Sequence, residues 1–295
     1  MTPVAAEGMR LMREFAEVEA LRAWVAGQRV AGRRIGLVPT MGALHEGHLT
    51  LVDTAARLTD AVLVSIFVNP LQFGPQEDFA RYPRDLVRDR ALLAARGAHA
   101  LFVPDVAVMY PPGSEIRVVP GALASKWEGA VRPDHFTGVL TIVAKLFNLV
   151  QPDLAVFGQK DIQQATLIRQ LVRDLDFSIA LEIVPIVREA DGMALSSRNA
   201  YLSRQDRRDG LILSQALRSA EAAWRAGARD PARMEQVLLQ QFLAAPAVTL
   251  DYVAIVDPRS LEPVREVSAG TIIALAARVG PTRLLDNHIL GTEFR

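Results

Sequence analysis

The chain has 295 residues, half of them hydrophobic, and its 33 basic residues balance 33 acidic ones. This composition is typical of a folded globular protein, and the balanced charge does not indicate nucleic acid or another polyanion as a partner. Cysteine is absent, which excludes disulfides, thiolate nucleophiles and cysteine-based metal sites. Because a single core stops growing near this length, we expect two domains.

The sequence contains no indication of export or membrane insertion. Residues 1–15 do not combine a basic start with an apolar core, as a secretory signal does. No apolar run approaches the roughly 18 residues that are needed to cross a bilayer. We therefore expect a cytoplasmic protein with no membrane partner.

Predicted strands and helices alternate from the N-terminus to about residue 187. Short apolar runs predict buried parallel strands at 33–39, 61–68, 99–104, 153–157 and 179–187. Amphipathic stretches predict helices at 14–31, 48–60, 85–97, 138–150 and 161–175. A loop rich in proline and glycine precedes the fourth of these helices. This alternation predicts an α/β fold with a doubly wound parallel sheet.

The pattern changes in the last third of the chain. Two helices rich in arginine and alanine are predicted at about 204–226 and 231–244, and three strands at 249–257, 271–278 and 283–290. We expect a domain of residues 1–187 and a smaller α+β domain of residues 188–295. The polar, turn-forming segment 188–199 is the predicted hinge between them.

Four polar segments follow predicted strands of the first domain. Ligands of open parallel sheets bind outside the carboxyl ends of the strands, so we expect these segments to meet in one crevice. They are PTMGALHEGH (39–48), NPLQFG (69–74), GQKDIQQ (158–164) and READGMALSSRN (188–199).

The first segment contains two histidines three positions apart. Pro39 and Gly42 suit a sharp turn, and a helix is predicted to begin near Glu46. The N–H groups and dipole of such a helix start favour a phosphate or carboxylate, to which His45 and His48 would add donors. Helix capping and metal binding are alternatives, although metalloprotease histidines are four apart on a helix. The chain has neither the G-x-G-x-x-G nor the P-loop pattern.

The second and third segments offer amides and one notable cation. Asn69 and Gln72 could recognise hydroxyl, carboxylate or amine groups, or could form an Asn-Pro turn with Gln72 in solvent. Lys160 is one of only three lysines among 33 basic residues, and it stands where a point charge could meet a phosphate. Asp161 and Gln164 could instead form a capping box.

The fourth segment ends in two serines and an arginine. Ser196, Ser197 and Arg198 offer two hydroxyls and a bidentate fork, which suit a polyphosphate, while a serine-rich helix cap is the alternative. Together the four segments provide phosphate donors and substrate amides without an obvious covalent nucleophile. Nucleotide chemistry driven by electrostatics is the function that this pattern favours.

The segments PTMGALHEGH, SIFVNPLQFG, FGQKDIQQ and DGMALSSRN resemble, in order and spacing, the signatures of the pantoate–β-alanine ligase family. That family belongs to the nucleotidyltransferase superfamily, with HIGH-like and KMSKS-like motifs. The resemblance implies a Rossmann-like domain and a two-step reaction. ATP and pantoate would give pantoyl adenylate and pyrophosphate, and β-alanine would then displace AMP to give pantothenate. It also implies Mg²⁺ on the ATP phosphates, with no direct protein ligand, and a homodimer.

The resemblance also implies roles for individual residues. The implied catalytic residues are His45, His48, Lys160 and Arg198, with His48 as the proton donor. The implied nucleotide contacts are Met41, Gly42, Ala43, Leu44, His45, Glu46, Gly47, His48, Gly158, Gln159, Lys160, Asp161, Val187, Leu195, Ser196, Ser197 and Arg198. The implied substrate contacts are Pro39, Thr40, Met41, Asn69, Gln72 and Gln164.

One departure from the family pattern is Leu195, because a methionine usually precedes the two serines and here Met193 stands two positions earlier. We expect little loss from this change. Residues 74–85 are the candidate lid over a water-sensitive adenylate. Two other functions remain open: a related nucleotidyltransferase that acts on another small acid, and a nucleotide-binding module without catalysis.

Overall fold

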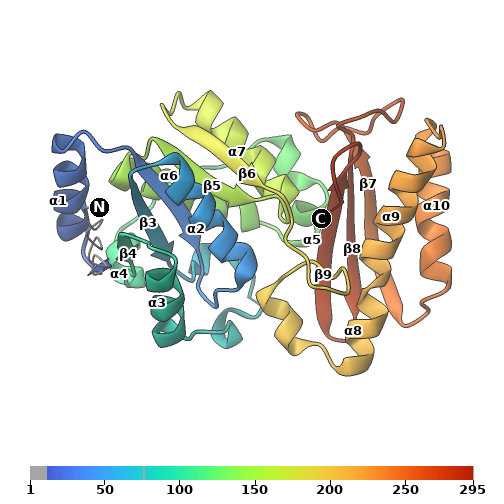
Figure 1. Ribbon diagram of the computed structural model, residues 1–295, viewed down its shortest axis with the longest axis horizontal. Coiled ribbons are helices and arrows are strands. Elements are labelled where there is room, and N and C mark those ends of the chain that lie inside the picture. The colour runs from blue at the N-terminus through green and yellow to red at the C-terminus, as the bar shows by residue number, and fades with distance from the viewer. Residues whose placement is uncertain (1–11, 76, 295) are drawn as a thin grey trace, which may run out of the picture.

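The structure is a computed structural model that describes residues 12–75 and 77–294, and it contains two separate sheets (Figure 1). The larger sheet has six strands, all parallel, in the order β1-β4-β3-β2-β5-β6. Its strands are β1 (Arg13–Phe15), β2 (Ile35–Thr40), β3 (Ala61–Ile66), β4 (Ala100–Phe102), β5 (Leu154–Gly158) and β6 (Ala180–Val184). The strand order reverses beside β2, and the crevice at such a switch point is where doubly wound sheets bind ligands.

In the described part of the chain, five helices cover the two faces of this sheet. They are α1 (Val18–Val30), α2 (Glu46–Leu58), α3 (Leu86–Ala95), α6 (His135–Val150) and α7 (Ile162–Asp174), and the short helices α4 (Val106–Met109) and α5 (Glu128–Val131) lie in the loop before α6. Leu37 of β2 packs into the core formed with α1, α6 and α7, whereas the next residue, Val38, packs into the core formed with α2 and α3. Alternate side chains of one strand therefore enter two cores, as a strand buried on both faces requires.

The smaller sheet is antiparallel and belongs to the C-terminal domain. It consists of β7 (Val248–Val256), β8 (Ile272–Val279) and β9 (Thr282–Ile289). The helices of this domain are α8 (Arg204–Gly210), α9 (Ile212–Arg225) and α10 (Pro231–Leu243). Helices α9 and α10 cover the outer face of the sheet (Figure 1), while the other face packs on Ile162 at the start of α7. The C-terminal domain is thus seated directly on the carboxyl edge of β5.

The fold class predicted from the sequence is confirmed, and two local predictions were wrong. The predicted helix at 204–226 is two helices that meet at Leu211, where the buried Gly210 lies so close to Leu284 that a Cβ would approach it to 2.9 Å. Residues 13–15 extend an edge strand beside β4 rather than starting a helix, because tertiary pairing outweighs their helical pattern. The loop before α6 contains the short helices α4 and α5.

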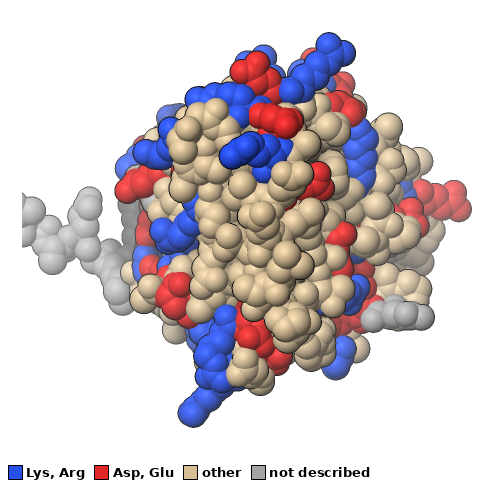
Figure 2. Space-filling view, turned by 90° about the vertical axis from the view of Figure 1, so that its right-hand side faces the viewer, with Lys and Arg blue, Asp and Glu red and all other residues tan. Residues whose placement is uncertain are grey.

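The surface of the C-terminal domain carries both signs of charge. On the face shown in Figure 2, basic and acidic side chains lie interspersed around an uncharged centre. Within the described ranges 12–75 and 77–294, no helix is long and apolar enough to cross a membrane. Residues 1–11, which include most of the segment considered for a signal peptide, lie outside the described residues.

Candidate active site

A cavity of about 700 Å³ lies between the carboxyl edge of the large sheet and the C-terminal domain. Residues from all four polar segments line it, so the structure brings these segments together. The predicted site residues in its wall are Met41, Gln72, Lys160, Asp161, Gln164, Ser196 and Arg198.

The turn after β2 is held by a buried carboxylate. Gly42 and Ala43 have positive φ angles of 85° and 51°, so this short stretch adopts a left-handed conformation that needs support. Asp89 of α3 provides it, because its two oxygens accept hydrogen bonds from the N–H groups of Ala43 at 2.9 Å and Leu44 at 2.8 Å. Asp89 was not predicted from the sequence, where it looks like an ordinary acid in an amphipathic helix.

The two histidines stand at the start of α2, which begins at Glu46 as predicted. Their rings lie 4.1 Å apart, and the N–H of His45 donates to Nδ1 of His48 at 3.4 Å. The Nδ1 atom of His48 is therefore an acceptor, which places the proton of the neutral ring on Nε2. Burial, together with nearby His45 and Lys160, lowers the pKa of His48 to about 3. Burial, together with Lys160 and Arg88, lowers the pKa of His45 to about 4.

The segment with the two serines lies against this helix start. An added Cβ at Gly47 would lie 3.0 Å from ring atoms of His45 and 3.8 Å from the Cβ of Leu195. The N–H of Leu195 donates to the carbonyl of Val187 at 3.0 Å, which holds the segment in place. The side chain of Glu46, by contrast, is exposed and pairs with Arg96 on the surface.

Asn69 and Gln72 form one connected amide pair. Asn69 is buried and donates to Oε1 of Gln72 at 3.1 Å and to the carbonyl of Gly138 at 3.0 Å, while it accepts from the hydroxyl of Tyr110 at 2.9 Å. Gln72 is also buried, and its amide approaches the sulfur of Met41 at 2.8 Å. The alternative of a solvated Gln72 is therefore wrong. Asn69 does form the predicted turn, and it holds Gln72 at the cavity.

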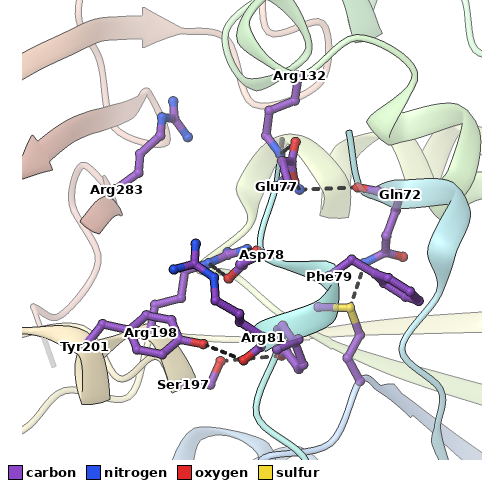
Figure 3. Close-up of polar contacts among 12 residues, drawn as sticks. Gln72, Glu77, Asp78, Phe79, Arg81, Arg132, Ser197, Arg198, Tyr201 and Arg283 are labelled. Carbon is purple, nitrogen blue, oxygen red and sulfur yellow. Dashed lines mark hydrogen bonds and ion pairs between the residues drawn. The ribbon is translucent and has the colours of Figure 1, made fainter. Parts of the chain in front are cut away.

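Arg132 and His135 are cavity residues that the sequence analysis missed. Nδ1 of His135 donates to the carbonyl of Gln72 at 2.8 Å, and its Nε2 lies 3.1 Å from Arg132. Arg132 also pairs with Glu77 at 2.6 Å (Figure 3). Burial and the charge of Arg132 lower the pKa of His135 to about 4, so the ring is neutral at neutral pH. No strand precedes these residues directly, so the rule about strand ends could not find them.

The candidate lid is tied to the segment with the two serines (Figure 3). Arg198 forms two hydrogen bonds with the carboxylate of Asp78, at 3.0 and 3.2 Å. The hydroxyl of Tyr201 donates to the carbonyl of Arg81 at 3.2 Å. Burial opposes ionisation of Asp78, but the hydrogen bonds and charge of Arg198 outweigh it and lower the pKa of Asp78. We call these contacts between residues 78–82 and 197–201 the latch.

Lys160 and Asp161 lie in the turn between β5 and α7. The side chain of Asp161 makes no capping hydrogen bond to α7, so the proposed capping box does not form. Both side chains instead face the cavity. The alternative that the serines cap a helix applies to Ser196, because its hydroxyl accepts a hydrogen bond from the N–H of Arg198 at 3.3 Å.

The other predicted residues, including both histidines, are not among those that line the cavity. They are Pro39, Thr40, Gly42, Ala43, Leu44, His45, Glu46, Gly47, His48, Asn69, Gly158, Gln159, Val187, Leu195 and Ser197. The arrangement offers a lysine, an arginine, neutral imidazoles and amides, which together suit anionic phosphate and carboxylate groups. Within residues 12–75 and 77–294, no group of three or more histidine or acidic side chains is placed to hold a metal.

A doubly wound α/β domain with this crevice belongs to the class of nucleotide-using α/β enzymes. Comparison with known proteins makes the assignment specific. The family model described as pantoate-beta-alanine ligase matches residues 13–289. The chain therefore belongs to the pantoate–β-alanine ligase family.

Two named relatives are similar to this chain in sequence over nearly the full length of both chains. A pantothenate synthetase of Agrobacterium fabrum is 52% identical over 97% of this chain and 97% of its own length. One from Heliobacterium modesticaldum is 50% identical over 95% of this chain and 99% of its own length.

Solved structures agree as well. Pantothenate synthetase from Thermus thermophilus superposes with a TM-score of 0.90 at 48% identity, over 94% of this chain and 99% of that chain. The enzyme from Francisella tularensis, solved with beta-gamma ATP and beta-alanine, gives 0.79 at 31% identity over 96% of this chain and 100% of that chain.

Proposed function

We propose that this chain condenses pantoate with β-alanine at the expense of ATP, through pantoyl adenylate, and releases AMP and pyrophosphate. The observation that carries the proposal is the family match over residues 13–289. The cavity supports it, because residues from the four family segments line one space there.

In the first step, a carboxylate oxygen of pantoate attacks the α-phosphorus of ATP and pyrophosphate leaves. The carboxylate is already ionised, so this step needs alignment and charge stabilisation rather than a base. We assign Gln72 and Gln164 to pantoate. Lys160 and the Nε2–H of His48 are assigned to the phosphates, where negative charge develops.

In the second step, the neutral amine of β-alanine attacks the acyl carbon, AMP leaves with the electrons of the acyl–oxygen bond, and the new amide nitrogen releases one proton to solvent. The ammonium form of β-alanine must lose a proton before this attack. Because a ring with a pKa of about 3 is a weak base, we assign His48 to hydrogen-bond donation and not to removal of that proton.

The nucleotide is assigned to the start of α2, residues 158–161, Val187 and residues 195–198. Mg²⁺ is proposed to arrive on the ATP phosphates, where it would neutralise part of their charge. Arg198 is proposed to exchange Asp78 for a phosphate when ATP binds, since the latch now uses its guanidinium. Residues 74–85 remain the proposed lid, and 188–199 the proposed hinge between domains of residues 1–187 and 188–295.

A homodimer in the cytoplasm is the proposed form of the protein. Sedimentation at several protein concentrations tests the homodimer. A single species with the mass of one chain would exclude it.

The decisive experiment measures AMP release from ATP and Mg²⁺ with pantoate, with and without β-alanine. We expect pantothenate and stoichiometric AMP only when all substrates are present. Turnover with a different acid in place of pantoate would favour a related nucleotidyltransferase. ATP binding without turnover would favour a non-catalytic module.

A further inference from the structure

A side chain of the C-terminal domain reaches the turn that carries Lys160. Asn287 belongs to β9, yet its Nδ2 donates to the carbonyl oxygens of Gln159 at 3.1 Å and of Lys160 at 3.0 Å. Its Oδ1 accepts from the side-chain amide of Gln159 at 3.0 Å. Both N–H groups and the oxygen of one amide are therefore bonded to two adjacent residues of the other domain.

The position of Asn287 is itself fixed. The side chain is 2% exposed, and its backbone N–H donates to Asp286 at 2.8 Å. Asp286 forms a buried, bidentate pair with Arg188 of the predicted hinge, with N–O distances of 2.6 and 2.9 Å. A bidentate pair of this kind defines the direction of both side chains. Asn287 thus projects from a rigid support toward the turn after β5.

Backbone hydrogen bonds hold the two ends of the Lys160 turn, and the contact with Asn287 lies between them. The N–H of Gln159 donates to the carbonyl of Val184 at 2.8 Å, which fixes the beginning of the turn. At its end, the carbonyl of Asp161 accepts from the N–H of Ala165 at 2.9 Å, while the side chain of Asp161 makes no capping bond to α7. Asn287 binds the carbonyls between these two points, those of Gln159 and Lys160. The orientation of the Lys160 peptide plane sets the direction in which the lysine side chain leaves the backbone.

We infer that Asn287 is a positioning residue for Lys160, so that adenylation requires the C-terminal domain to be seated on the β5–α7 turn. The inference rests on the proposed function, in which Lys160 binds the ATP phosphates. Asn287 forms part of the cavity lining, but its side-chain amide is taken up by Gln159 and Lys160, so the role inferred here acts through the backbone of Lys160. An amide suits the task because it offers two donors, whereas an aspartate would present negative oxygens to two carbonyls.

The first test uses the three lysines of the chain as separate probes. The full-length protein is labelled with ¹³C,¹⁵N-lysine, and the ε-CH₂ signal of Lys160 is assigned with Lys160→Arg. In Asn287→Ala we expect the Lys160 signal to shift or broaden, while the signals of Lys126 and Lys145 stay in place. Leu238→Ala is the control. Leu238 is a fully buried residue of α10, so its truncation should lower the stability of the same domain without changing any contact of the Lys160 turn. An unmoved Lys160 signal, or equal movement of all three, overturns the inference.

The second test is kinetic and uses a double-mutant cycle. Single-turnover pyrophosphate release from ATP and pantoate should fall about tenfold or more in Asn287→Ala, and further in Asn287→Asp. In a Lys160→Ala background the same Asn287 change should cost less than about twofold, because its effect passes through Lys160. Equal losses in both backgrounds would indicate a structural role only.

Folding is checked by circular dichroism, and Asn287→Ser, which keeps one donor, replaces the alanine variant if that variant unfolds. Failure of the proposed function and failure of the positioning role of Asn287 give different results. Failure of the wild-type chain to release pyrophosphate would refute the proposed function, while the lysine signals would still report on the contact between Asn287 and the turn.

Discussion

Lys160 is the residue on which the proposed adenylation depends most directly. It is a point charge in the cavity wall, next to the histidines whose pKa values it helps to lower. We predict that Lys160→Ala slows adenylation by about 10²-fold or more without unfolding the protein, as expected for a lost, positioned charge. Pyrophosphate release by the purified variant measures this effect.

The matched control is Lys126→Ala. Lys126 forms a partly exposed ion pair with Glu262, and such pairs contribute little, so we expect near-normal rates. If both lysine variants lost activity equally, a specific role for Lys160 would be untenable.

The protonation state of His48 gives a second prediction at this scale. Because burial, His45 and Lys160 lower the pKa of His48 to about 3, the ring should remain neutral throughout the range in which an ordinary histidine titrates. Ring resonances followed by NMR from about pH 8 to about pH 5.5, assigned with His48→Gln, should therefore show no titration of His48. A midpoint near the ordinary value of about 6.5 would contradict the hydrogen-bond donor role, because the ring would then be available as a base.

The latch is the feature that matters most at the scale of elements. Arg198 cannot bind both Asp78 and a phosphate with the same two N–H groups, so the ion pair competes with ATP. We predict that Asp78→Asn tightens ATP binding several-fold, since a partly buried pair contributes about 1 kcal/mol. Calorimetric titration with ATP in the absence of pantoate measures the change.

Two variants of the same latch serve as controls. Tyr201→Phe removes the hydrogen bond to the carbonyl of Arg81 without changing any charge, so ATP affinity should stay near the wild-type value. Arg198→Ala should weaken ATP binding. If Asp78→Asn and Tyr201→Phe had the same effect, lid mobility and not competition for Arg198 would be the cause.

The sequence predicted those elements and residues whose signal is local. Periodicity found the main strands and helices, and the rule about strand ends found Met41, Gln72 and Lys160. Residues that reach the site from elsewhere were not predictable in this way. Asp89 supports the turn after β2, although it lies 45 positions away in sequence from Leu44. Asn287 supports the Lys160 turn from another domain. Only the tertiary fold creates these contacts.

At the scale of the whole molecule, the two domains share polar contacts that are largely buried. Glu128 of α5 accepts hydrogen bonds from Tyr252 at 3.0 Å and Arg283 at 2.6 Å, both from the C-terminal sheet. Asn287 makes another such connection, at the Lys160 turn. Polar groups buried in this way favour one relative placement of the domains, because a displaced domain would leave them unpaired. Because both domains contribute residues to the wall of the cavity, a displaced C-terminal domain would also disrupt that wall.

Three histidines with lowered pKa values make the stability of the whole molecule depend on pH. The pKa values of His45, His48 and His135 are lowered to about 4, 3 and 4, whereas the unfolded chain has ordinary histidines near 6.5. Below about pH 6.5 the unfolded state therefore binds protons that the folded state does not, and stability falls with pH until the folded rings titrate. Lowering the pH from 6.5 to 5.5 should cost about 1 kcal/mol per ring, or about 3 kcal/mol for these three rings, and the step from 7.5 to 6.5 about a third as much. The pKa of His288 is also lowered by burial, so its ring adds to the loss in the same direction.

Urea unfolding at about pH 7.5, 6.5 and 5.5 measures this dependence. His135→Gln should reduce the loss between pH 6.5 and 5.5 by about 1 kcal/mol, because it removes one titrating ring while its amide can still donate to the carbonyl of Gln72. Burial raises the pKa of Asp89 and Asp286, which opposes the histidines only as the pH approaches the range in which carboxylates titrate. Equal unfolding free energies at the two lower pH values would mean that these rings are protonated in the folded protein, and their assignment as neutral donors would fail with that result.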